Sequence, residues 1–286
     1  MTEVATFAMS DQLLVVIDPV ARRADGESVR IAKDVLSAGA ATKVCLPDGP
    51  DEFARALARR GSRRPVVVGD DRALMRAVSL LHRQRELAEC VLSVVPVGGA
   101  LSLAGSLGVP TGAVAAARAV LDGVERRLDL LVDDSDGVVL GALRIPPLRD
   151  PAAPAVATAV APGAGRPWLR TCQSLVRTLV PARVTSSAVP GPSRLRVEVD
   201  GATLVDLDQP VEGVSVMPGT AGVAEVEVRP VSVGAEASPL RAVGRTVTVS
   251  GAHFRYRADA AVSGPVRTRT WTVREGAWGL TVPASP

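Results

Sequence analysis

Two stretches of the sequence decide the fold: VVVGDDRALMRAV at residues 66–78 and VVPVGGALSLAGSLGVP at residues 94–110. Each begins with a short apolar run, passes through a turn of small or acidic residues, and ends in a segment with helical spacing. A strand, a small-residue turn and a helix form the unit by which α/β proteins present backbone N–H groups to phosphate. The two stretches therefore predict an α/β domain with a ligand site at these turns.

The same alternation extends over the first half of the chain. Apolar runs predict strands at 12–17, 41–46, 66–68, 90–95 and 127–132, and helical spacing predicts helices at 26–37, 51–60, 73–87 and 114–123. Strands that alternate with helices at this spacing are typical of βαβ units and a parallel sheet. We therefore expect residues 1–133 to form a three-layer α/β domain with a mostly parallel sheet.

The pattern changes near Asp133, where strands become short and turns frequent. Strands are predicted at 194–200, 203–207, 211–217, 224–230, 246–250, 253–257, 268–274 and 279–282, and several alternate polar with apolar residues. Residues 146–167 are rich in Pro and Ala, which predicts a long loop, and 168–179 predict a helix. We expect residues 134–286 to form an antiparallel β-sandwich-like domain, with any ligand cleft between the two domains.

Composition narrows the class of protein. The 286 residues carry a net charge of +3, lysine occurs only as Lys33 and Lys43, and asparagine is absent, a bias typical of GC-rich, actinobacterial coding sequence. The mild positive charge permits attraction to anionic lipid or nucleotide without implying it. No apolar run reaches the roughly 18 residues of a transmembrane helix.

The compartment is predicted from the cysteines and the N-terminus. The three cysteines are odd in number and far apart, which favours reduced thiols over disulfides or a metal site. The N-terminus lacks the pattern of a signal peptide. We therefore expect a cytoplasmic protein, with peripheral association at the inner membrane face as an alternative.

The order and spacing of the motifs resemble the catalytic family of diacylglycerol kinases, which includes bacterial lipid kinases and sphingosine kinases. That family reads GGDGT at the first turn and P-x-GTGND at the second, where this chain reads GDDRA at 69–73 and PVGGALS at 96–102. The resemblance covers nearly the whole chain and extends to RLRVEVDGATLVDLDQPVEGVSVMPG at 194–219. It implies Mg-ATP as cofactor and transfer of phosphate to a lipid hydroxyl, with a carboxylate accepting the hydroxyl proton.

The resemblance also implies a set of cofactor-binding residues. They are Asp18, Pro19, Gly69, Asp70, Arg72, Ala73, Gly98, Gly99 and Ser102. Many family groups are replaced at these positions. Asp18 stands where the family has an asparagine, and an ionised carboxylate only accepts hydrogen bonds. Asp70 replaces a glycine, and a carboxylate about 4 Å from a phosphate charge costs about 4 kcal/mol at an effective dielectric near 20.

Several interpretations of these turns stay open. In one interpretation Arg22 or Arg23 neutralises Asp18, and Arg72 offsets Asp70. In the other, which is favoured for Asp18, the turn simply ends the strand and the arginines are solvated. The first turn is then a degraded site, a remodelled nucleotide site, or a Mg²⁺ site built on the adjacent carboxylates at 70 and 71. For Ser102 the favoured role is to cap the following helix.

The resemblance places catalytic acids at Asp71 and Asp259. Asp71 matches the family aspartate of the first turn, and Asp259 is what remains of an Asp-Gly-Glu segment, where it would act as a general base. A turn aspartate is the structural alternative for Asp259. His82 and His253 are isolated, with no pattern for a metal site or a triad, and His82 is expected to be exposed.

The sequence therefore predicts a lipid-kinase-like protein whose activity is weak or lost. ATP and Mg²⁺ are its expected cofactors if it is active, and none otherwise. The alternatives are a binding or regulatory module for a lipid, a nucleotide or a protein, and a structural scaffold. A lipid or membrane surface and a second copy of the chain are the expected partners. Nucleic acid is not expected, because arginine-rich segments such as 59–64 lack interleaved aromatic residues.

Overall fold

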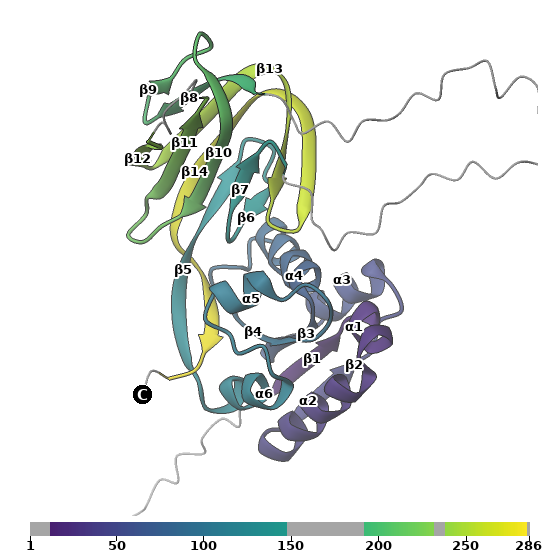
Figure 1. The fold of residues 1–286 in the computed structure, drawn as a ribbon. Coiled ribbons are helices and arrows are strands. Elements are labelled where there is room, and N and C mark those ends of the chain that lie inside the picture. Colours follow the sequence, from purple (N-terminus) through teal and green to yellow (C-terminus); the bar gives the residue numbers. More distant parts are fainter. Residues whose placement is uncertain (1–11, 148–191, 232–237, 285–286) are drawn as a thin grey trace, which may run out of the picture. The chain divides into compact units, whose positions relative to one another are not determined.

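The computed structural model describes residues 12–147, 192–231 and 238–284, which all belong to one compact unit (Figure 1). The predicted helix at 168–179 and nearly all of the predicted loop at 146–167 lie outside the described residues. No helix in the described part is long and apolar enough to cross a membrane.

Parallel strands form the first half of the chain. They are β1 (Leu13–Ile17), β2 (Thr42–Cys45), β3 (Arg64–Gly69) and β4 (Val91–Pro96), paired in the order β2-β1-β3-β4. Every one of these pairs is parallel. β1 is apolar and buried at each position because both of its faces are covered.

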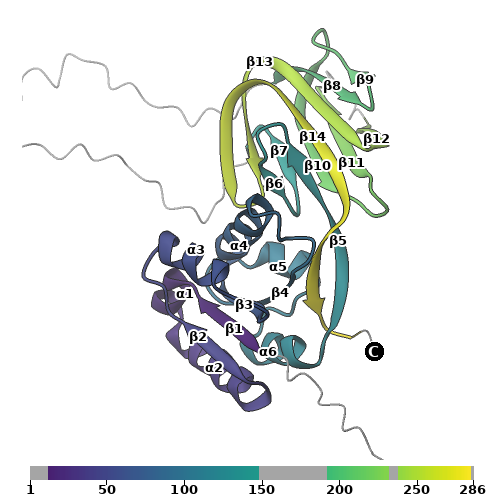
Figure 2. The same ribbon diagram turned by 180° about the vertical axis from the view of Figure 1, so that it is seen from behind.

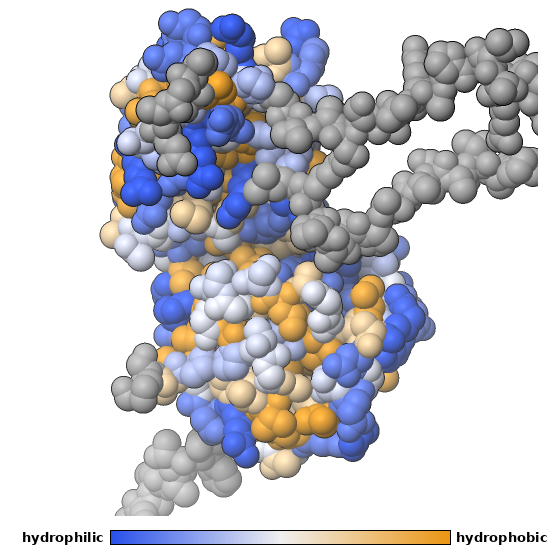
Figure 3. Space-filling model, viewed as in Figure 1, coloured by the Kyte–Doolittle hydropathy of each residue, from blue (hydrophilic) through white to orange (hydrophobic). Residues whose placement is uncertain are grey.

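Helices cover the two faces of these strands. They are α1 (Pro19–Ala24), α2 (Gly26–Gly39), α3 (Pro50–Ala58), α4 (Asp71–Arg83), α5 (Ser102–Ser106) and α6 (Ala113–Asp122). Figures 1 and 2 show α2 and α6 on one side of the strands and α3 and α4 on the other. Alternate residues of β1 accordingly enter different cores: Leu14 packs with Phe53 and Leu74, and Leu13 packs with Val29 and Leu36. On the face seen in Figure 3, hydrophobic residues reach the surface over this α/β part.

The second half is an antiparallel sheet. Its strands are β5 (Val124–Asp133), β6 (Val138–Val139), β7 (Leu143–Ile145), β8 (Ser193–Val199), β9 (Ala202–Val205), β10 (Pro210–Pro218), β11 (Ala224–Pro230), β12 (Leu240–Gly244), β13 (Thr246–Ala258) and β14 (Ala261–Val282). They enclose a separate core of Val, Leu and aromatic side chains. β7 and β8 both pair with β10 and with β13, so they lie one after the other between these two strands.

The long strand β14 joins the two halves. It pairs antiparallel with β13 and β5, and its last part pairs in parallel with β4 at Gly279 and Leu280. Trp271 of β14 is buried in the core of the β part, and Trp278 is buried with the α/β residues. One hydrogen-bonded path of strands therefore runs through the described residues, where the sequence predicts strands at 268–274 and 279–282 separately.

Candidate functional site

The turn between β3 and α4 is built by close packing around Gly69. A Cβ on this residue would lie 2.5 Å from the Ala73 Cβ and 3.1 Å from the Asp18 Cβ. Both distances are shorter than van der Waals contact, so only glycine fits here. The turns after β1 and β3 therefore lie in contact, with Gly69 packed against Ala73 and Asp18.

Asp70 caps α4 with its own side chain. Its Oδ1 accepts hydrogen bonds from the backbone N–H groups of Arg72 and Ala73, each at 3.1 Å. Both N–H groups belong to the first turn of the helix and have no acceptor within the helix itself. They are the groups that would bind a phosphate at a helix N-terminus. In this chain a side-chain carboxylate occupies them.

Asp71 ties the first turn to the second. Its buried carboxylate accepts from the backbone N–H groups of Leu103 at 3.0 Å and Ala104 at 3.1 Å, and from the Ser102 hydroxyl at 3.3 Å. Its own N–H donates to the Ala100 carbonyl at 2.8 Å. The prediction that Ser102 caps α5 is wrong, because Asp71 reaches across from α4 and caps that helix instead.

Asp18 is buried at the start of α1 with Arg76 as its counter-ion. One carboxylate oxygen accepts from the Val20 N–H at 3.0 Å, and the other lies 2.6 Å from Arg76 Nη1. The expectation that Arg22 or Arg23 neutralises Asp18 is wrong, since Arg22 pairs with Asp48. Pro19 occupies the first turn of α1, where its missing N–H costs nothing.

The turn after β4 leaves free space, whereas the Asp70 side chain fills the turn after β3. Gly98 has φ +129°, a conformation that only glycine adopts readily, and a Cβ there would lie 3.2 Å from the Asp70 Cβ. A Cβ at Gly99 would meet nothing within 4 Å. Gly98 therefore lies against the Asp70 side chain, and Gly99 faces free space.

Asp259 lies between β13 and β14 and binds the loop between β6 and β7. Its carboxylate accepts backbone N–H bonds from Leu140 and Gly141 at 2.8 Å and from Ala142 at 2.9 Å. Desolvation by burial raises the pKa of Asp259, the three N–H donors oppose this, and the Asp71 charge raises the pKa further. The structure thus brings the two predicted catalytic acids into electrostatic range of each other.

The described residues do not form a cage for a metal ion. No group of three or more His, Cys, Asp or Glu side chains in this part of the chain is placed to hold one. The carboxylates at 70 and 71 point to different N–H donors instead of converging. A magnesium site built on these two residues therefore does not fit the geometry, and we derive no step through it.

A pocket of about 410 Å³ opens beside this cluster. Its lining residues are Arg72, Met75, Arg76, Ser79, Asp133, Gly137, Val138, Val139, Tyr256, Ala258, Ala260, Ala261 and Ser263. They come from α4, from the β5–β6 turn and from the β13–β14 hairpin. Arg72 is exposed and forms no ion pair with another described residue, whereas Arg76 is held by Asp18. The pocket therefore offers one available cation among hydroxyl and apolar groups, together with the carboxylate of Asp133, which pairs with Arg269.

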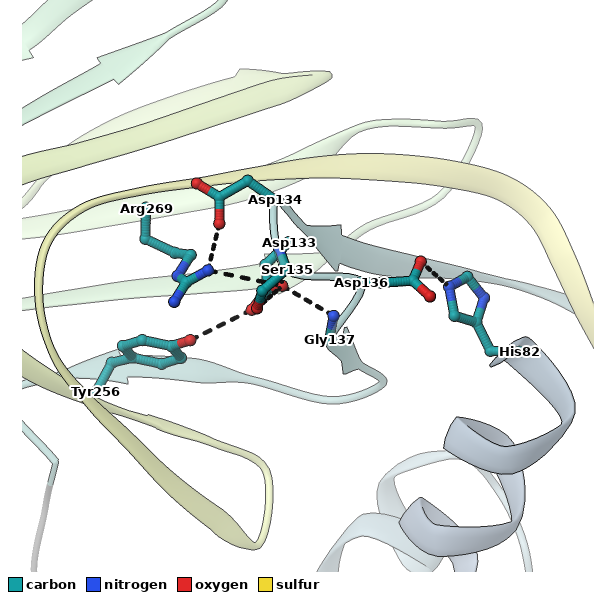
Figure 4. A network of polar contacts seen from close by, with 8 residues as sticks. All are labelled: His82, Asp133, Asp134, Ser135, Asp136, Gly137, Tyr256 and Arg269. Carbon is teal, nitrogen blue, oxygen red and sulfur yellow. Dashed lines mark hydrogen bonds and ion pairs between the residues drawn. The ribbon is translucent and has the colours of Figure 1, made fainter. Parts of the chain in front are cut away.

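Asp133 organises the wall of the pocket opposite α4 (Figure 4). Its carboxylate accepts from the N–H and hydroxyl of Ser135 at 2.8 and 2.7 Å and from the Gly137 N–H at 2.8 Å. The Tyr256 hydroxyl donates to it at 3.3 Å, and Arg269 pairs with it and with Asp134. Burial by itself would raise the pKa of Asp133, but these hydrogen bonds and the Arg269 charge lower it below its usual value.

His82, at the end of α4, contacts the same turn. Its Nε2 lies 2.9 Å from Asp136 Oδ1, and its side chain is only 15 % exposed, so the prediction of an exposed His82 is wrong (Figure 4). This contact fastens α4 to the β5–β6 turn.

Sequence reasoning missed Arg76, Asp133 and Tyr256 as site residues. The sequence holds a signal for Arg76 and one for Asp133, and none for Tyr256. Arg72 and Arg76 are four residues apart and so share one face of α4. The segment DDSDG at 133–137 has the composition of a side-chain-stabilised turn.

Comparisons with known proteins give a fold but no family assignment from sequence. No family model matches the chain, and no curated protein matches it.

Solved structures match over nearly the full length. One is described as "a putative diacylglycerol kinase from Bacillus anthracis str. Sterne", with 11 % identity, a TM-score of 0.68, and coverage of 96 % of this chain and 98 % of that one. A second from the same organism has 13 % identity, a TM-score of 0.69, and coverage of 96 % and 97 %. A third has 12 % identity, a TM-score of 0.66 and the same coverage. The chain therefore has a diacylglycerol-kinase-like fold.

Proposed function

We propose that this protein is a diacylglycerol-kinase-like lipid-binding module in which phosphoryl transfer is lost or severely weakened. Residues 1–133 would act as the nucleotide-binding-like α/β domain and residues 134–286 as the lipid-binding-like β domain. The protein would work in the cytoplasm and reach lipid at the inner membrane face.

The observation that carries the proposal is the position of Asp70. Its carboxylate takes the N–H groups of Arg72 and Ala73, which a nucleotide phosphate would need. A phosphate entering this turn would displace that cap and meet a negative charge. At about 4 Å and an effective dielectric near 20, the repulsion costs about 4 kcal/mol.

Asp71 and Asp259 support the same conclusion. A general base needs a lone pair directed at the substrate hydroxyl. In this chain both carboxylates are directed at backbone N–H groups of neighbouring loops. Both side chains therefore have structural tasks that do not require a substrate.

The pocket beside α4 supports the binding half of the proposal. Arg72 would pair with an anionic headgroup, and the hydroxyl of Ser79 would donate a hydrogen bond to it. Apolar groups from Met75 and Val139 would contact the start of an acyl chain. A lipid with a small anionic headgroup matches this lining.

The test of the nucleotide site is isothermal titration with ATP and Mg²⁺. We expect no measurable binding by the wild-type protein. Asp70→Gly restores the family residue, frees two N–H donors and removes the repulsive charge, so ATP binding should strengthen at least about tenfold, or about 1.4 kcal/mol. Asp25→Gly is the matched control, because Asp25 caps α2 in the same way, through Ser28, away from this turn. It should leave ATP binding unchanged.

The test of the pocket uses a short-chain, soluble phosphatidic acid as the probe and a short-chain phosphatidylcholine as the comparison. We expect binding of the phosphatidic acid alone, weakened about tenfold or more by Arg72→Ala, because a charge-assisted hydrogen bond is worth about 1.5–3 kcal/mol. Arg83→Ala, an exposed arginine of the same helix, should have no effect. ATP-dependent phosphorylation of diacylglycerol by the wild-type protein would overturn the proposed loss of activity.

A second candidate is an active ATP-dependent lipid kinase. The effect of the Asp71 charge on Asp259 favours it, because two acids from distant parts of the chain then interact through space. In that case ATP and Mg²⁺ are the cofactors, and the two aspartates are the catalytic acids. Asp259→Asn would then abolish transfer while leaving the binding of phosphatidic acid intact.

A further inference from the structure

The end of β13 carries a row of basic side chains on its outer face. Residues 254, 256 and 258 are buried in the core of the β part. Since side chains alternate along a strand, His253, Arg255 and Arg257 between them lie on the opposite face. The first two are exposed and Arg257 is half-buried.

Neighbouring strands extend this row. Arg144 of β7 is exposed and lies directly opposite Arg257 in the antiparallel register. Arg267 of β14 is exposed and donates from Nε to Nε2 of His253 at 3.3 Å. We call Arg144, Arg255, Arg257 and Arg267 the arginine stripe.

Three arginines of the stripe are not balanced by carboxylates of the described residues in the way that arginines elsewhere on the sheet are. On β11 and β12, Glu227 pairs with Arg229 at 3.0 Å and with Arg241 at 3.3 Å. In contrast, Arg144, Arg255 and Arg267 form no ion pair with any residue in the described ranges. These three guanidinium groups therefore form a surface whose charge an external anion would neutralise.

The turn that joins β13 to β14 adds an apolar contact to the stripe. Val262 is 49 % exposed and lies opposite Arg257 in the hairpin. A basic surface with a projecting apolar side chain matches the interface of an anionic bilayer, where headgroups attract the cations and the apolar group enters the acyl boundary. Proteins that bind single-stranded nucleic acid stack its bases on exposed aromatic side chains. The aromatic residues of this hairpin, Phe254 and Tyr256, are buried, so the surface does not match such a site.

We propose that the arginine stripe and Val262 form a docking surface for an anionic lipid bilayer. The inference builds on the proposed lipid-binding function, and it assigns the membrane contact to one face of one hairpin. Ala260, Ala261 and Ser263 of that hairpin line the pocket beside α4. The hairpin therefore belongs both to the docking surface and to the rim of the pocket.

The experiment is co-sedimentation of the full-length protein with sucrose-loaded vesicles. One set contains phosphatidylglycerol and phosphatidylcholine in equal parts, and the other contains phosphatidylcholine alone. We expect binding to the first set only, weakened by added salt. Each arginine near an anionic surface contributes about fivefold, so the triple variant Arg144→Gln, Arg255→Gln, Arg267→Gln should bind about a hundredfold more weakly.

The matched control removes the same charge from another surface. Arg23, Arg59 and Arg83 are exposed on the α/β part and form no ion pair with another described residue. The triple glutamine variant at these positions should bind vesicles like the wild type. Equal losses in both variants would show that net charge alone drives binding and would overturn the proposal. Val262→Ser should weaken binding without changing its salt dependence.

Two further outcomes separate this proposal from its alternatives. Stripe-dependent binding of duplex DNA that is tighter than vesicle binding would assign the surface to nucleic acid and overturn the proposal. The stripe variant should still bind soluble phosphatidic acid, and Arg72→Ala should still bind vesicles. Failure of the pocket and failure of the docking surface are therefore distinguishable.

Discussion

At the scale of the residue, aspartate carboxylates accept the backbone hydrogen bonds that a bound anion would otherwise accept. Asp70 and Asp71 each satisfy N–H groups at a helix N-terminus, and Asp259 satisfies three N–H groups of a loop. A phosphate would use the same kind of donors. The chain thus keeps the donor geometry of an anion site and supplies the anion from its own side chains.

A structural role for Asp71 predicts a loss of stability on mutation. Asp71→Asn replaces one accepting oxygen by an NH₂ group, which would face the N–H of Leu103 or Ala104 in a buried site. The free energy of unfolding should fall by about 1–3 kcal/mol, measured by urea denaturation. Asp51→Asn, at an exposed position in the first turn of α3, should change it by less than about 0.5 kcal/mol. Unchanged stability of Asp71→Asn would contradict the structural role.

The pKa values of Asp259 and Asp133 predict opposite pH dependences of stability. The pKa of Asp259 is raised from 3.8, so its contribution is present below that pH and is lost as the pH rises through the raised value. The pKa of Asp133 is lowered from 3.8, so its contribution is present above that pH and is lost as the pH falls through the lowered value.

The measurement is urea unfolding of the wild type and of the Asp259→Asn and Asp133→Asn variants at a series of pH values on both sides of 3.8. With rising pH, the stability advantage of the wild type over Asp259→Asn should shrink. The advantage over Asp133→Asn should grow. The reverse trend for either residue would show that its pKa shifts in the other direction.

Residue identities predicted which turns meet, but not what their side chains do there. Gly69 and Asp18 were assigned to one site from the family resemblance, and their turns lie in contact. Asp71 and Asp259 were assigned to the same site, and the charge of Asp71 acts on Asp259. The partners of the carboxylates are backbone N–H groups of other loops, and a side chain's sequence position does not reveal the direction in which it points. For the same reason the Arg76 counter-ion of Asp18 was missed.

At the scale of the element, the sequence predicted long periodic segments well. β1, α2, α3, β3 and α6 begin and end within a few residues of the predicted bounds. The short elements α1, β6 and β7 were missed because so few residues carry no measurable periodicity. The two strands predicted at 246–250 and 253–257 are one strand, β13, in which a bulge shifts the register between Ser250 and Phe254.

The junction between α6 and β5 predicts a strict requirement for glycine. A Cβ on Gly123 would lie 2.2 Å from the Ala119 carbonyl oxygen and 2.4 Å from that of Val282, so the backbone would have to move. Gly123→Ala should lower the free energy of unfolding by about 1–3 kcal/mol or more, as overpacking does. Gly112→Ala, at the other end of α6 with no atom within 4 Å, is the control and should be close to neutral in urea denaturation. Equal effects of the two variants would contradict the close approach at Gly123.

At the scale of the whole molecule, separate cores are linked by shared strands. β14 supplies Trp271 to the β core and Trp278 to an α/β core, and both side chains are fully buried. β5 pairs with β14 along both stretches. Strain or loosening in one core therefore reaches the other through backbone hydrogen bonds.

This linkage predicts one cooperative unfolding transition. In a Trp168→Phe background, the variants Trp271→Phe and Trp278→Phe each leave one tryptophan, which reports on one core. Each substitution destabilises the protein on its own, so each variant should be followed by tryptophan fluorescence and by circular dichroism. The two probes should give coincident midpoints within each variant. Separate midpoints would show that the α/β core and the β core unfold independently.

The place of β14 in the sheet also bears on synthesis of the chain at the ribosome. β4 and β5 are made early, yet the strand that pairs with both of them comes from residues 261–282. Until those residues leave the exit tunnel, the edge of β4 stays open and the site of Trp278 stays empty. The nascent α/β part must therefore wait for β14, and it exposes an unpaired edge to chaperones until residues 261–282 have been made.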